Sequence, residues 1–248
     1  MIKNLHDLRD ADIIYAGRKS VALGKMICAG IPVPSGFVIY KDVLGPVPGE
    51  NRFRIPDNIK IKILSFLPAL KSRQFAIRSS AISEDGLDES LAGRYESFIG
   101  VTEEDIFEAI EKCRGQDNSD SGMAVIVQAA VFGDASGVSF SADPESGDRN
   151  WVYIEAAKNP NAVTSGIENP HFYSVHKKTG EIIYGPAGPK ELGGNSNIES
   201  ELLNQKDIGR LSDLVLKIEE IFGYPVDVEW VKKGDSFGIK VDQPTKPG

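Results

Sequence analysis

The sequence predicts an α+β protein built from two lobes. Its 248 residues are enough for two compact units, each with its own hydrophobic core. Residues 115–122, GQDNSDSG, have the small and polar composition of a linker, and strand patterns predominate beyond them. We therefore expect an N-terminal lobe over residues 1–114, a linker over 115–122 and a C-terminal lobe over 123–248.

Composition and charge narrow the class of ligand. Hydrophobic residues make up 41% of the chain and charged residues 26%, as in ordinary globular proteins. The 28 lysines and arginines are outnumbered by 36 acidic residues, which gives a formal net charge of −8. Because no basic cluster offsets this charge, nucleic acids and anionic membranes are poor partners. A polyanionic ligand must instead be bound by a few individually placed cations.

Cysteine usage and the N-terminal segment predict a cytoplasmic location. Cys28 and Cys113 are the only cysteines, and their spacing matches neither a metal site nor a redox motif. The first ten residues, MIKNLHDLRD, lack the apolar core of a signal peptide. The sequence also contains no run of about eighteen apolar residues that would predict a transmembrane helix.

A lysine near the start of the first predicted helix is a candidate anion-binding group. Gly17, Arg18 and Lys19 precede a helical pattern over residues 20–29, and a buried strand is predicted over 36–40. A glycine turn with a lysine at a helix N-terminus favours an anion, because backbone N–H groups and the helix dipole point toward it. The alternative is an ordinary helix start with solvated cations.

The segment from Phe75 to Val101 holds a second candidate cation, Arg78. A short apolar strand runs into this arginine and two serines, and a loop of small and acidic residues follows. A planar guanidinium beside hydroxyls and backbone N–H groups suits phosphate oxygens, which it can bind bidentately. The alternative is a surface loop in which Arg78 pairs with Glu84 or Asp85.

Further elements follow from periodicity and turn signals. Thr102 is expected to cap a helix with an acidic first turn and a core face that includes Ile106 and Ile110. The three histidines stand apart in the sequence, and no role is assigned to them. The remaining predicted elements are helices over 59–70 and 207–222, strands over 123–132, 137–142 and 150–157, and a hairpin of strands over 172–176 and 181–184.

The C-terminal hairpin is a candidate metal site. Residues 226–231 alternate in polarity, so Asp227 and Glu229 point to one face, roughly 6–7 Å apart along the strand. The turn is expected over 232–236 and the returning strand over 237–243. Two carboxylates beside an oxygen donor on the partner strand suit Mg²⁺. The alternative is a solvated sheet face, where such acids are common.

Four blocks, taken in order, resemble one family. Residues 17–40, 75–101, 123–144 and 219–243 look like the nucleotide-binding domain of pyruvate phosphate dikinase, phosphoenolpyruvate synthase and rifampicin phosphotransferase. The resemblance implies an ATP-grasp fold, with ATP and Mg²⁺ held between two α+β lobes. It also implies a reaction that splits ATP into AMP and two phosphates and moves the β-phosphoryl group onto a histidine of a separate swivelling domain.

In the N-terminal blocks the resemblance assigns four residues. Lys19 matches the family's phosphate-binding lysine, and Arg78 matches the arginine that follows its apolar strand. Gly93 matches the glycine of a loop that covers the triphosphate, and Gln128 falls at the hinge between the lobes, near the adenine. Lys19 and Arg78 are the implied catalytic residues, because they neutralise phosphate charge as it redistributes.

In the C-terminal blocks the resemblance assigns the metal site. Asp227 and Glu229 match the family's acidic pair, and Gln243 matches the glutamine of its closing motif. Glu229 and Gln243 are the implied Mg²⁺ ligands, with Asp242 as the competing neighbour, because a one-residue bulge would exchange it with Gln243.

Several positions depart from the family pattern. The closing motif reads QPTKP from Gln243, so the family's arginine is absent and Lys246 stands nearby. The glycine-rich stretch after the Glu155 match is replaced by KNPN at 158–161. The spans 41–74 and 102–122 are shorter than in the family, and the histidine-bearing domain is not part of the sequence.

Four functions are weighed from these features. The first is an ATP-binding component of a dikinase-like phosphotransferase that works with a separate phosphohistidine carrier and a small acceptor such as pyruvate. The second is a nucleotide-binding module without phosphoryl transfer, which the missing arginine favours. The third is an ATP-grasp enzyme that activates a small carboxylate as an acyl phosphate. The fourth is an excised fragment of a longer enzyme.

Overall fold

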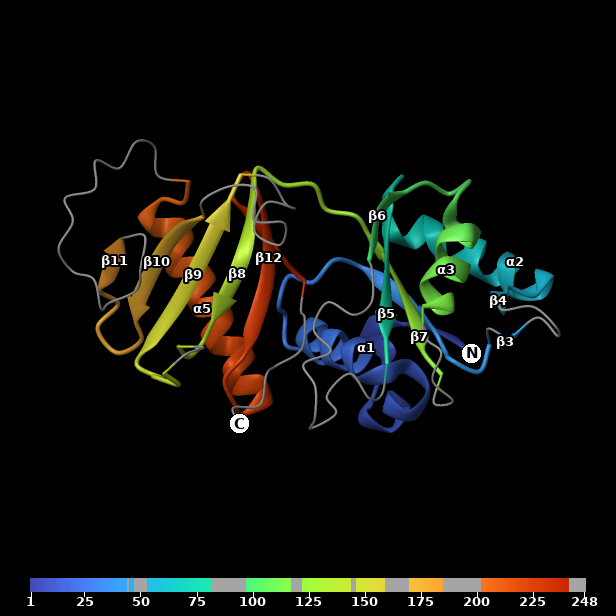
Figure 1. Ribbon diagram of the computed structural model, residues 1–248, viewed down its shortest axis with the longest axis horizontal. Coiled ribbons are helices and arrows are strands. Elements are labelled where there is room, and N and C mark those ends of the chain that lie inside the picture. Colours follow the sequence, from blue (N-terminus) through green and yellow to red (C-terminus); the bar gives the residue numbers. More distant parts are fainter. Residues whose placement is uncertain are drawn as a thin grey trace. The chain divides into compact units, whose positions relative to one another are not determined.

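The computed structural model describes residues 1–43, 45–46, 53–81, 97–116, 122–143, 146–158, 170–184 and 202–240 (Figure 1). The chain divides into two compact units. The first consists of Met1–Cys28 and Pro34–Ala130, and the second of Ala29–Val33 and Val131–Gly248. Each unit contains one principal antiparallel sheet with helices, so the predicted α+β, two-lobed organisation is confirmed.

The sheet of the first unit brings together strands from distant parts of the chain. Its spatial order is β1-β2-β7-β5-β6, and each neighbouring pair is antiparallel. A short two-stranded ribbon joins β3 and β4. The strands are β1 (Ile2–Asn4), β2 (Gly36–Ile39), β3 (Gly45–Pro46), β4 (Phe53–Arg54), β5 (Phe75–Ser80), β6 (Phe98–Val101) and β7 (Ala124–Ala129).

The division between the units differs from the boundary expected at 115–122. Strand β7 follows that segment, yet it pairs with β2 and β5 in the centre of the first sheet. The change of unit therefore falls after Ala130. Linker-like composition does not tell whether a segment joins two units or two elements of one unit.

Helices cover both faces of the first sheet. Helices α2 (Asp57–Phe66) and α3 (Ile106–Gly115) enclose a core with inward side chains such as Phe37, Phe75 and Ile77. Helix α1 (Ile13–Cys28) packs against β2, β5 and β7 on the other face. Short 3₁₀ turns lie at Leu5–Asp7 (η1), Asp10–Asp12 (η2) and Leu67–Leu70 (η3).

Two helix starts differ from the sequence prediction. Helix α1 begins at Ile13, and its dihedral angles are interrupted at Gly17, so the stretch predicted from residue 20 is its second part. Helix α3 begins at Ile106, with Asp105 as its N-cap residue. The Thr102 hydroxyl donates to the Asp105 carboxylate at 2.8 Å instead of capping the helix. The side chain therefore satisfies a local turn, as short hydroxyl side chains commonly do.

Among the described residues, the second unit is an antiparallel six-stranded sheet with helix α5 packed on it. The sheet order is β11-β10-β9-β8-β12-β13, which includes both predicted hairpins. Helix α5 (Gln205–Phe222) packs on β9 and β10 through residues such as Leu211 and Val215. The strands are β8 (Ala135–Phe140), β9 (Trp151–Ala157), β10 (His171–His176), β11 (Ile182–Tyr184), β12 (Asp227–Lys233) and β13 (Ser236–Lys240).

The ends of α5 show why the sequence predicts this helix well. The Asn204 side chain accepts a hydrogen bond from the Asp207 backbone at 2.9 Å, which satisfies one of the free N–H groups of the first turn. Gly223 ends the helix with φ of 78°. None of the helices in the described ranges is both long enough and apolar enough to cross a membrane.

Candidate functional site

The Lys19 turn is built against the end of β5. At Gly17 the backbone adopts φ 76° and ψ 164°, which breaks α1 into two parts. A Cβ atom at this position would lie 2.2 Å from the carbonyl oxygen of Ser80, so only glycine permits the approach. Beyond the break, the Ser20 backbone N–H donates to the Ser80 hydroxyl at 3.1 Å. The helix that carries Lys19 therefore starts directly on the strand that carries Arg78.

Two further hydrogen bonds fix this junction. The Arg18 backbone N–H donates to the Ala81 carbonyl at 3.2 Å, and the Ser20 hydroxyl donates to the Ser80 hydroxyl at 3.0 Å. Ser20 and Ser80 are buried and lie 60 residues apart in the sequence. The fold thus brings the two predicted cation segments together.

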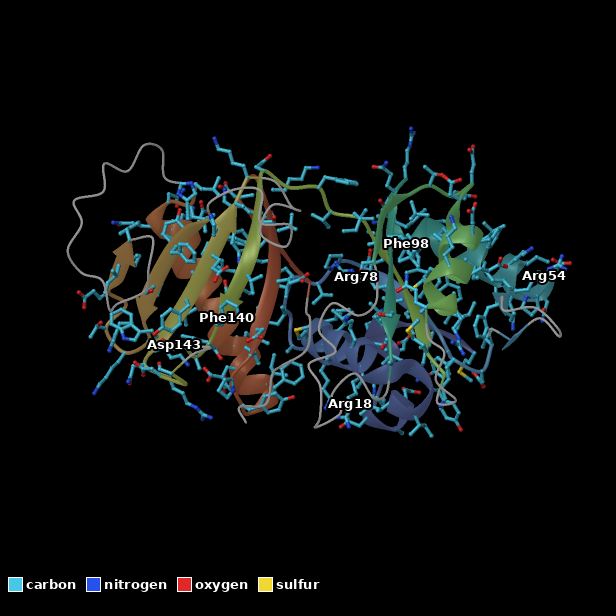
Figure 2. All side chains as sticks on the ribbon, in the orientation of Figure 1. Arg18, Arg54, Arg78, Phe98, Phe140 and Asp143 are labelled. Atoms are coloured by element: carbon cyan, nitrogen blue, oxygen red, sulfur yellow. The ribbon has the colours of Figure 1, made fainter. Side chains whose placement is uncertain are left out.

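Arg78 lies on the face of the first sheet that α1 covers. Its neighbours at alternate positions, Ala76 and Ser80, share this face, whereas Phe75 and Ile77 point into the core. Figure 2 labels Arg78 on β5 and Arg18 on α1. The Arg78 side chain is 5% exposed, and among the described residues it makes no hydrogen bond or ion pair. A buried cation needs a counter-charge, and a phosphate group can provide it.

Gln128 lies on the same sheet face as Arg78, because it pairs with Ala76 on β5. Its carboxamide is buried and donates to the Pro34 carbonyl at 2.9 Å. Pro34 follows the segment Ala29–Val33 of the second unit, and Gln128 precedes the end of the first unit by two residues. Gln128 therefore lies at the position in the chain where a hinge is expected, with one donor already used by the backbone.

The acidic pair lies on one face of the second sheet. Asp227 and Glu229 alternate with Val228 and Trp230, whose side chains are buried. The predicted alternation of the strand is therefore confirmed. Within the second unit, α5 lies on the opposite face, where its Asp207 pairs with Lys232 at 3.3 Å. Two carboxylates on one face provide the oxygen ligands that a divalent cation prefers.

A third carboxylate, Glu155, lies on this face, and sequence reasoning did not assign it a role. Val138 of β8 pairs with Glu229 on one side and with Glu155 of β9 on the other. Two strand spacings therefore separate the two acidic residues, about 10 Å in all. Burial disfavours the charged form and raises the pKa of Glu155 above its ordinary value. A single glutamate within the otherwise apolar strand WVYIEAA was the available signal.

The neighbouring row on this face is aromatic. Asp227 pairs with Phe140 of β8, and Phe140 pairs with Tyr153 of β9. Burial, together with the carboxylates of Asp143 and Asp148, raises the pKa of Tyr153 to about 12. The phenol therefore stays protonated at physiological pH. Phe140 is the last residue of β8, and Asp143 follows it by three residues (Figure 2).

The remaining predicted site residues are not part of the described structure. Gly93 and Gln243 lie outside the described residues, as do Asp242 and the proposed partners of Arg78, Glu84 and Asp85. Within the described ranges, no group of three or more histidine, cysteine, aspartate or glutamate side chains is arranged to hold a metal ion. The acidic pair therefore needs a further oxygen donor.

Comparison with protein families identifies the chain's relatives. The family model described as "Pyruvate phosphate dikinase, AMP/ATP-binding domain" matches residues 51–241. An uncharacterized phosphotransferase of Bacillus subtilis is 29% identical over 87% of this chain and 31% of its own length. A probable phosphoenolpyruvate synthase of Methanocaldococcus jannaschii is 25% identical over 94% of this chain and 26% of its own. A rifampicin phosphotransferase of Streptomyces sviceus is 26% identical over 98% of this chain and 35% of its own length.

Solved structures show the same fold at low sequence identity. The D-alanine–D-alanine ligase of Helicobacter pylori matches with a TM-score of 0.50 and 10% identity, over 95% of this chain and 55% of that chain. At such identity the likeness concerns the fold alone. It supports the predicted ATP-grasp class.

Proposed function

The chain belongs to the family of the pyruvate phosphate dikinase AMP/ATP-binding domain, and on this premise we propose that it supplies the ATP-binding step of a dikinase-type phosphotransferase. The β-phosphoryl group of ATP passes to a histidine of a separate swivelling domain or protein. The bond to the α-phosphate breaks with AMP as the leaving group, and cleavage of the bond to the γ-phosphate by water releases inorganic phosphate. This region makes up 26% to 35% of the length of the three relatives, and the names of two of them, a phosphoenolpyruvate synthase and a rifampicin phosphotransferase, point to different acceptors. The choice of acceptor, such as pyruvate, is therefore assigned to other parts of such proteins.

The observation that carries the proposal is the junction between the Lys19 turn and β5. It joins a helix N-terminus, a lysine and a buried arginine within one unit. Each of these features favours phosphate for a separate reason: the positive end of the helix dipole, a point charge on a long side chain and a planar fork of donors. In a chain with a net charge of −8, such a local concentration of positive groups is selective for a bound anion.

The nucleotide-binding roles of the other residues follow from the same proposal. Glu229 and Gln243 hold Mg²⁺, and Asp227 contributes to the nucleotide site from the same strand face. Gly93 contacts the triphosphate and Gln128 approaches the adenine. When bound, Mg²⁺ neutralises phosphate oxygens as charge moves between them. The carboxylate oxygens of Asp227 and Glu229 fit this hard cation.

Lys19 and Arg78 act by electrostatics and positioning. During transfer, negative charge moves onto the oxygen atoms of the leaving nucleotide and of the migrating phosphoryl group. The Lys19 ammonium and the Arg78 guanidinium stabilise that charge without forming a covalent bond. Because α1 and β5 hold both side chains before the reaction, little reorganisation is needed.

Thermal unfolding in the presence of Mg-ATP tests the nucleotide site. We expect millimolar Mg-ATP to raise the melting temperature, because a ligand that binds only the folded state stabilises it. Lys19→Ala and Arg78→Gln should reduce the shift strongly. Arg54→Gln is the matched control, because Arg54 is exposed in β4 of the same unit. Equal shifts in all variants would contradict the assignment.

Product analysis tests the reaction class. With labelled ATP and a histidine-bearing partner, we expect AMP and a phosphorylated partner histidine. ADP formed with a small carboxylate would indicate acyl-phosphate chemistry instead. ATP binding without turnover in the presence of a competent partner would indicate a binding module, the alternative that the altered closing motif favours.

A further inference from the structure

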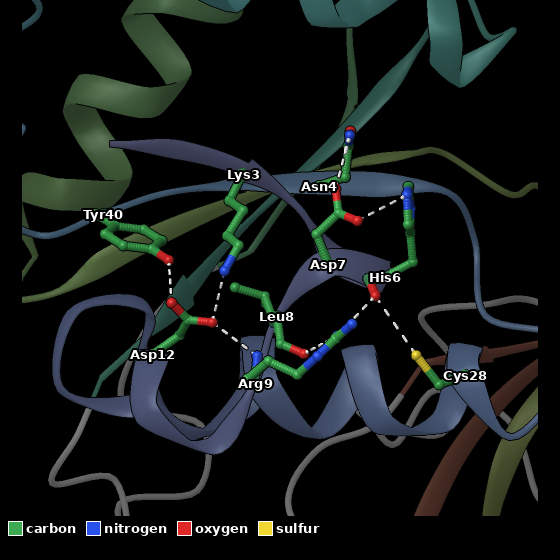
Figure 3. A network of polar contacts seen from close by, with 9 residues as sticks. All are labelled: Lys3, Asn4, His6, Asp7, Leu8, Arg9, Asp12, Cys28 and Tyr40. Atoms are coloured by element: carbon green, nitrogen blue, oxygen red, sulfur yellow. Dashed lines mark hydrogen bonds and ion pairs between the residues drawn. The ribbon is translucent and has the colours of Figure 1, made fainter.

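A partly buried carboxylate, Asp12, lies at the base of α1, outside the residues assigned to the nucleotide. Asp12 accepts three hydrogen bonds, which Figure 3 shows. The Tyr40 hydroxyl donates to one carboxylate oxygen at 2.6 Å, and the Lys3 ammonium donates to the other at 2.9 Å. The Arg9 backbone N–H donates to the second oxygen at 2.7 Å. Only 17% of the Asp12 side chain is exposed.

Asp12 is held in its charged form. Burial alone would raise its pKa, but the hydrogen bonds from Tyr40, Lys3 and Arg9 outweigh burial and hold the pKa below its ordinary value. A carboxylate offers acceptors only, so all three donors are matched. The network is therefore rigid and specific, and a neutral amide in its place would present an N–H₂ group to at least one of these donors.

The network fixes the first part of α1 to the sheet. Lys3 belongs to β1 and Tyr40 follows β2, while Asp12 immediately precedes α1. Two further contacts support the attachment. The Lys41 backbone N–H donates to the Tyr15 carbonyl at 3.0 Å, and the rings of Tyr15 and Tyr40 stack with centroids 5.9 Å apart. Residues 13–16 are thus anchored on the β1–β2 side.

The Lys19 turn is anchored on its other side by β5. Gly17 separates the two anchors, and its positive φ allows backbone directions that other residues resist. Lys19 lies two residues beyond this joint, next to the contact between Ser20 and Ser80. The direction in which the chain enters the Lys19 turn therefore depends on the attachment at Asp12.

From this arrangement we infer that Asp12 is a positioning residue for the Lys19 turn and selectively strengthens binding of the phosphate groups of ATP. The inference rests on the proposed function, because it requires Lys19 to contact phosphate. Asp12 touches no part of the nucleotide in this scheme and acts through the backbone of residues 13–18. Loss of the network leaves the adenosine contacts intact but misplaces the lysine.

The sign of the effect separates this role from a simple charge effect. Removal of a negative charge near an anion site strengthens anion binding, because it removes a Coulomb repulsion. Salt screening, with a length of about 8 Å at physiological ionic strength, weakens this effect. Positioning predicts the opposite: Asp12→Asn should weaken ATP binding. A purely structural role would lower stability and weaken ATP and adenosine alike.

Calorimetric titration of the full chain with Mg-ATP, and with adenosine by displacement, tests the inference. For Asp12→Asn and Tyr40→Phe we expect a dissociation constant for ATP raised by roughly three- to ten-fold, with that for adenosine unchanged. Tyr40→Phe retains the stacked ring, so it tests the network even if Asp12→Asn does not fold. Asp10→Asn is the matched control, because Asp10 pairs with Lys25 in an exposed ion pair and should change neither constant.

Three outcomes overturn the inference: an unchanged dissociation constant for ATP, a tighter one, or equal losses for ATP and adenosine. Lys19→Ala is measured in parallel and distinguishes the two proposals. If Lys19→Ala weakens ATP binding while Asp12→Asn and Tyr40→Phe do not, the positioning role fails and the phosphate site stands. If Lys19→Ala has no effect, the proposed phosphate site itself fails.

Discussion

Replacement of Gly17 by alanine tests the junction on which the phosphate site depends. The backbone at φ 76° and ψ 164° lies in a region that is nearly exclusive to glycine, and occupation by alanine costs about 1–3 kcal/mol. The new methyl group would also lie 2.2 Å from the Ser80 carbonyl oxygen and 2.4 Å from its hydroxyl. Displacement of β5 to relieve this overlap adds about 1–3 kcal/mol. We expect the first unit to lose about 3 kcal/mol or more of its free energy of unfolding.

A matched variant separates backbone strain from overlap. Gly180 also has a positive φ, 71°, but a Cβ atom there would meet nothing within 4 Å. Gly180→Ala should therefore cost only the conformational penalty, about 1–2 kcal/mol. The difference between the two variants measures the contact with Ser80. Gly17→Ala should also weaken ATP binding at least about ten-fold, because Lys19 follows the joint by two residues.

The assay can report the two units separately. Both tryptophans of the chain, Trp151 and Trp230, belong to the second unit. Tryptophan fluorescence therefore follows unfolding of that unit, whereas calorimetry and far-ultraviolet circular dichroism follow both. Gly17→Ala should lower the transition that lacks a fluorescence signal. A loss no larger than that of Gly180→Ala, with ATP binding unchanged, would refute the reasoning about the junction.

Three predictions concern the second unit. Glu229→Gln should abolish Mg²⁺-dependent turnover while Mg²⁺-free nucleotide binding, measured by calorimetry with EDTA, persists; unchanged turnover contradicts the metal assignment. Glu155 has a raised pKa in the folded state, so its contribution to stability decreases as pH rises above 4.5, the ordinary value. Glu155→Gln should therefore stabilise the unit at pH 7.5 by less than about 1 kcal/mol and give no gain at pH 4 in tryptophan-monitored melting. Asp207 is buried and pairs with Lys232 at 3.3 Å. Asp207→Asn should therefore lower the free energy of unfolding, measured by urea denaturation, by about 3 kcal/mol. A decrease of less than about 1 kcal/mol would contradict this prediction.

Much of the fold follows from local patterns in the sequence. Helix α5 has a hydrophobic stripe, an asparagine cap and a glycine stop, and the alternation in β12 places Asp227 and Glu229 together. Each of these signals involves only a few neighbouring residues, so it can be recognised in the sequence without knowledge of the tertiary structure. The same is true of the β10–β11 hairpin.

The features that sequence reasoning missed depend on contacts between distant segments. Nothing near residue 124 indicates that β7 inserts between β2 and β5. Asp12, which immediately precedes α1, is bound by Lys3 of β1 and by Tyr40, the residue after β2. Glu155 gains significance only because β8 pairs with both β9 and β12 and places Glu155 two strand spacings from Glu229 on one face. Such pairings are long-range, and local propensity cannot encode them.

The candidate site was predicted in part for a related reason. Lys19 and Arg78 were each predicted to bind phosphate from their own surrounding sequence. Each also had an alternative role, as a solvated cation for Lys19 and as a paired cation for Arg78. The structure brings their segments together through Gly17, Ser20 and Ser80, and this makes a common role the simpler explanation. The Gly17 turn and the serines after Arg78 were each expected to suit an anion, but no local pattern indicated that Gly17, Ser20 and Ser80 join the two segments.

Similarity of fold alone does not identify the reaction that an ATP-grasp protein catalyses. The ligase of Helicobacter pylori shares the fold at 10% identity, whereas the phosphoenolpyruvate synthase and rifampicin phosphotransferase relatives share the family. Because one fold serves several chemistries, the phosphorus atom that is attacked must be set by local groups. Cations that stabilise the β-phosphate and the departing AMP oxygen favour attack at the β-phosphorus and release of AMP. Cations that stabilise the terminal phosphate and the departing ADP oxygen favour attack at the terminal phosphorus and release of ADP. If Lys19 and Arg78 have the first role, Lys19→Ala should reduce AMP formation without producing ADP. A change of product from AMP to ADP would instead show that Lys19 selects the phosphorus atom that reacts.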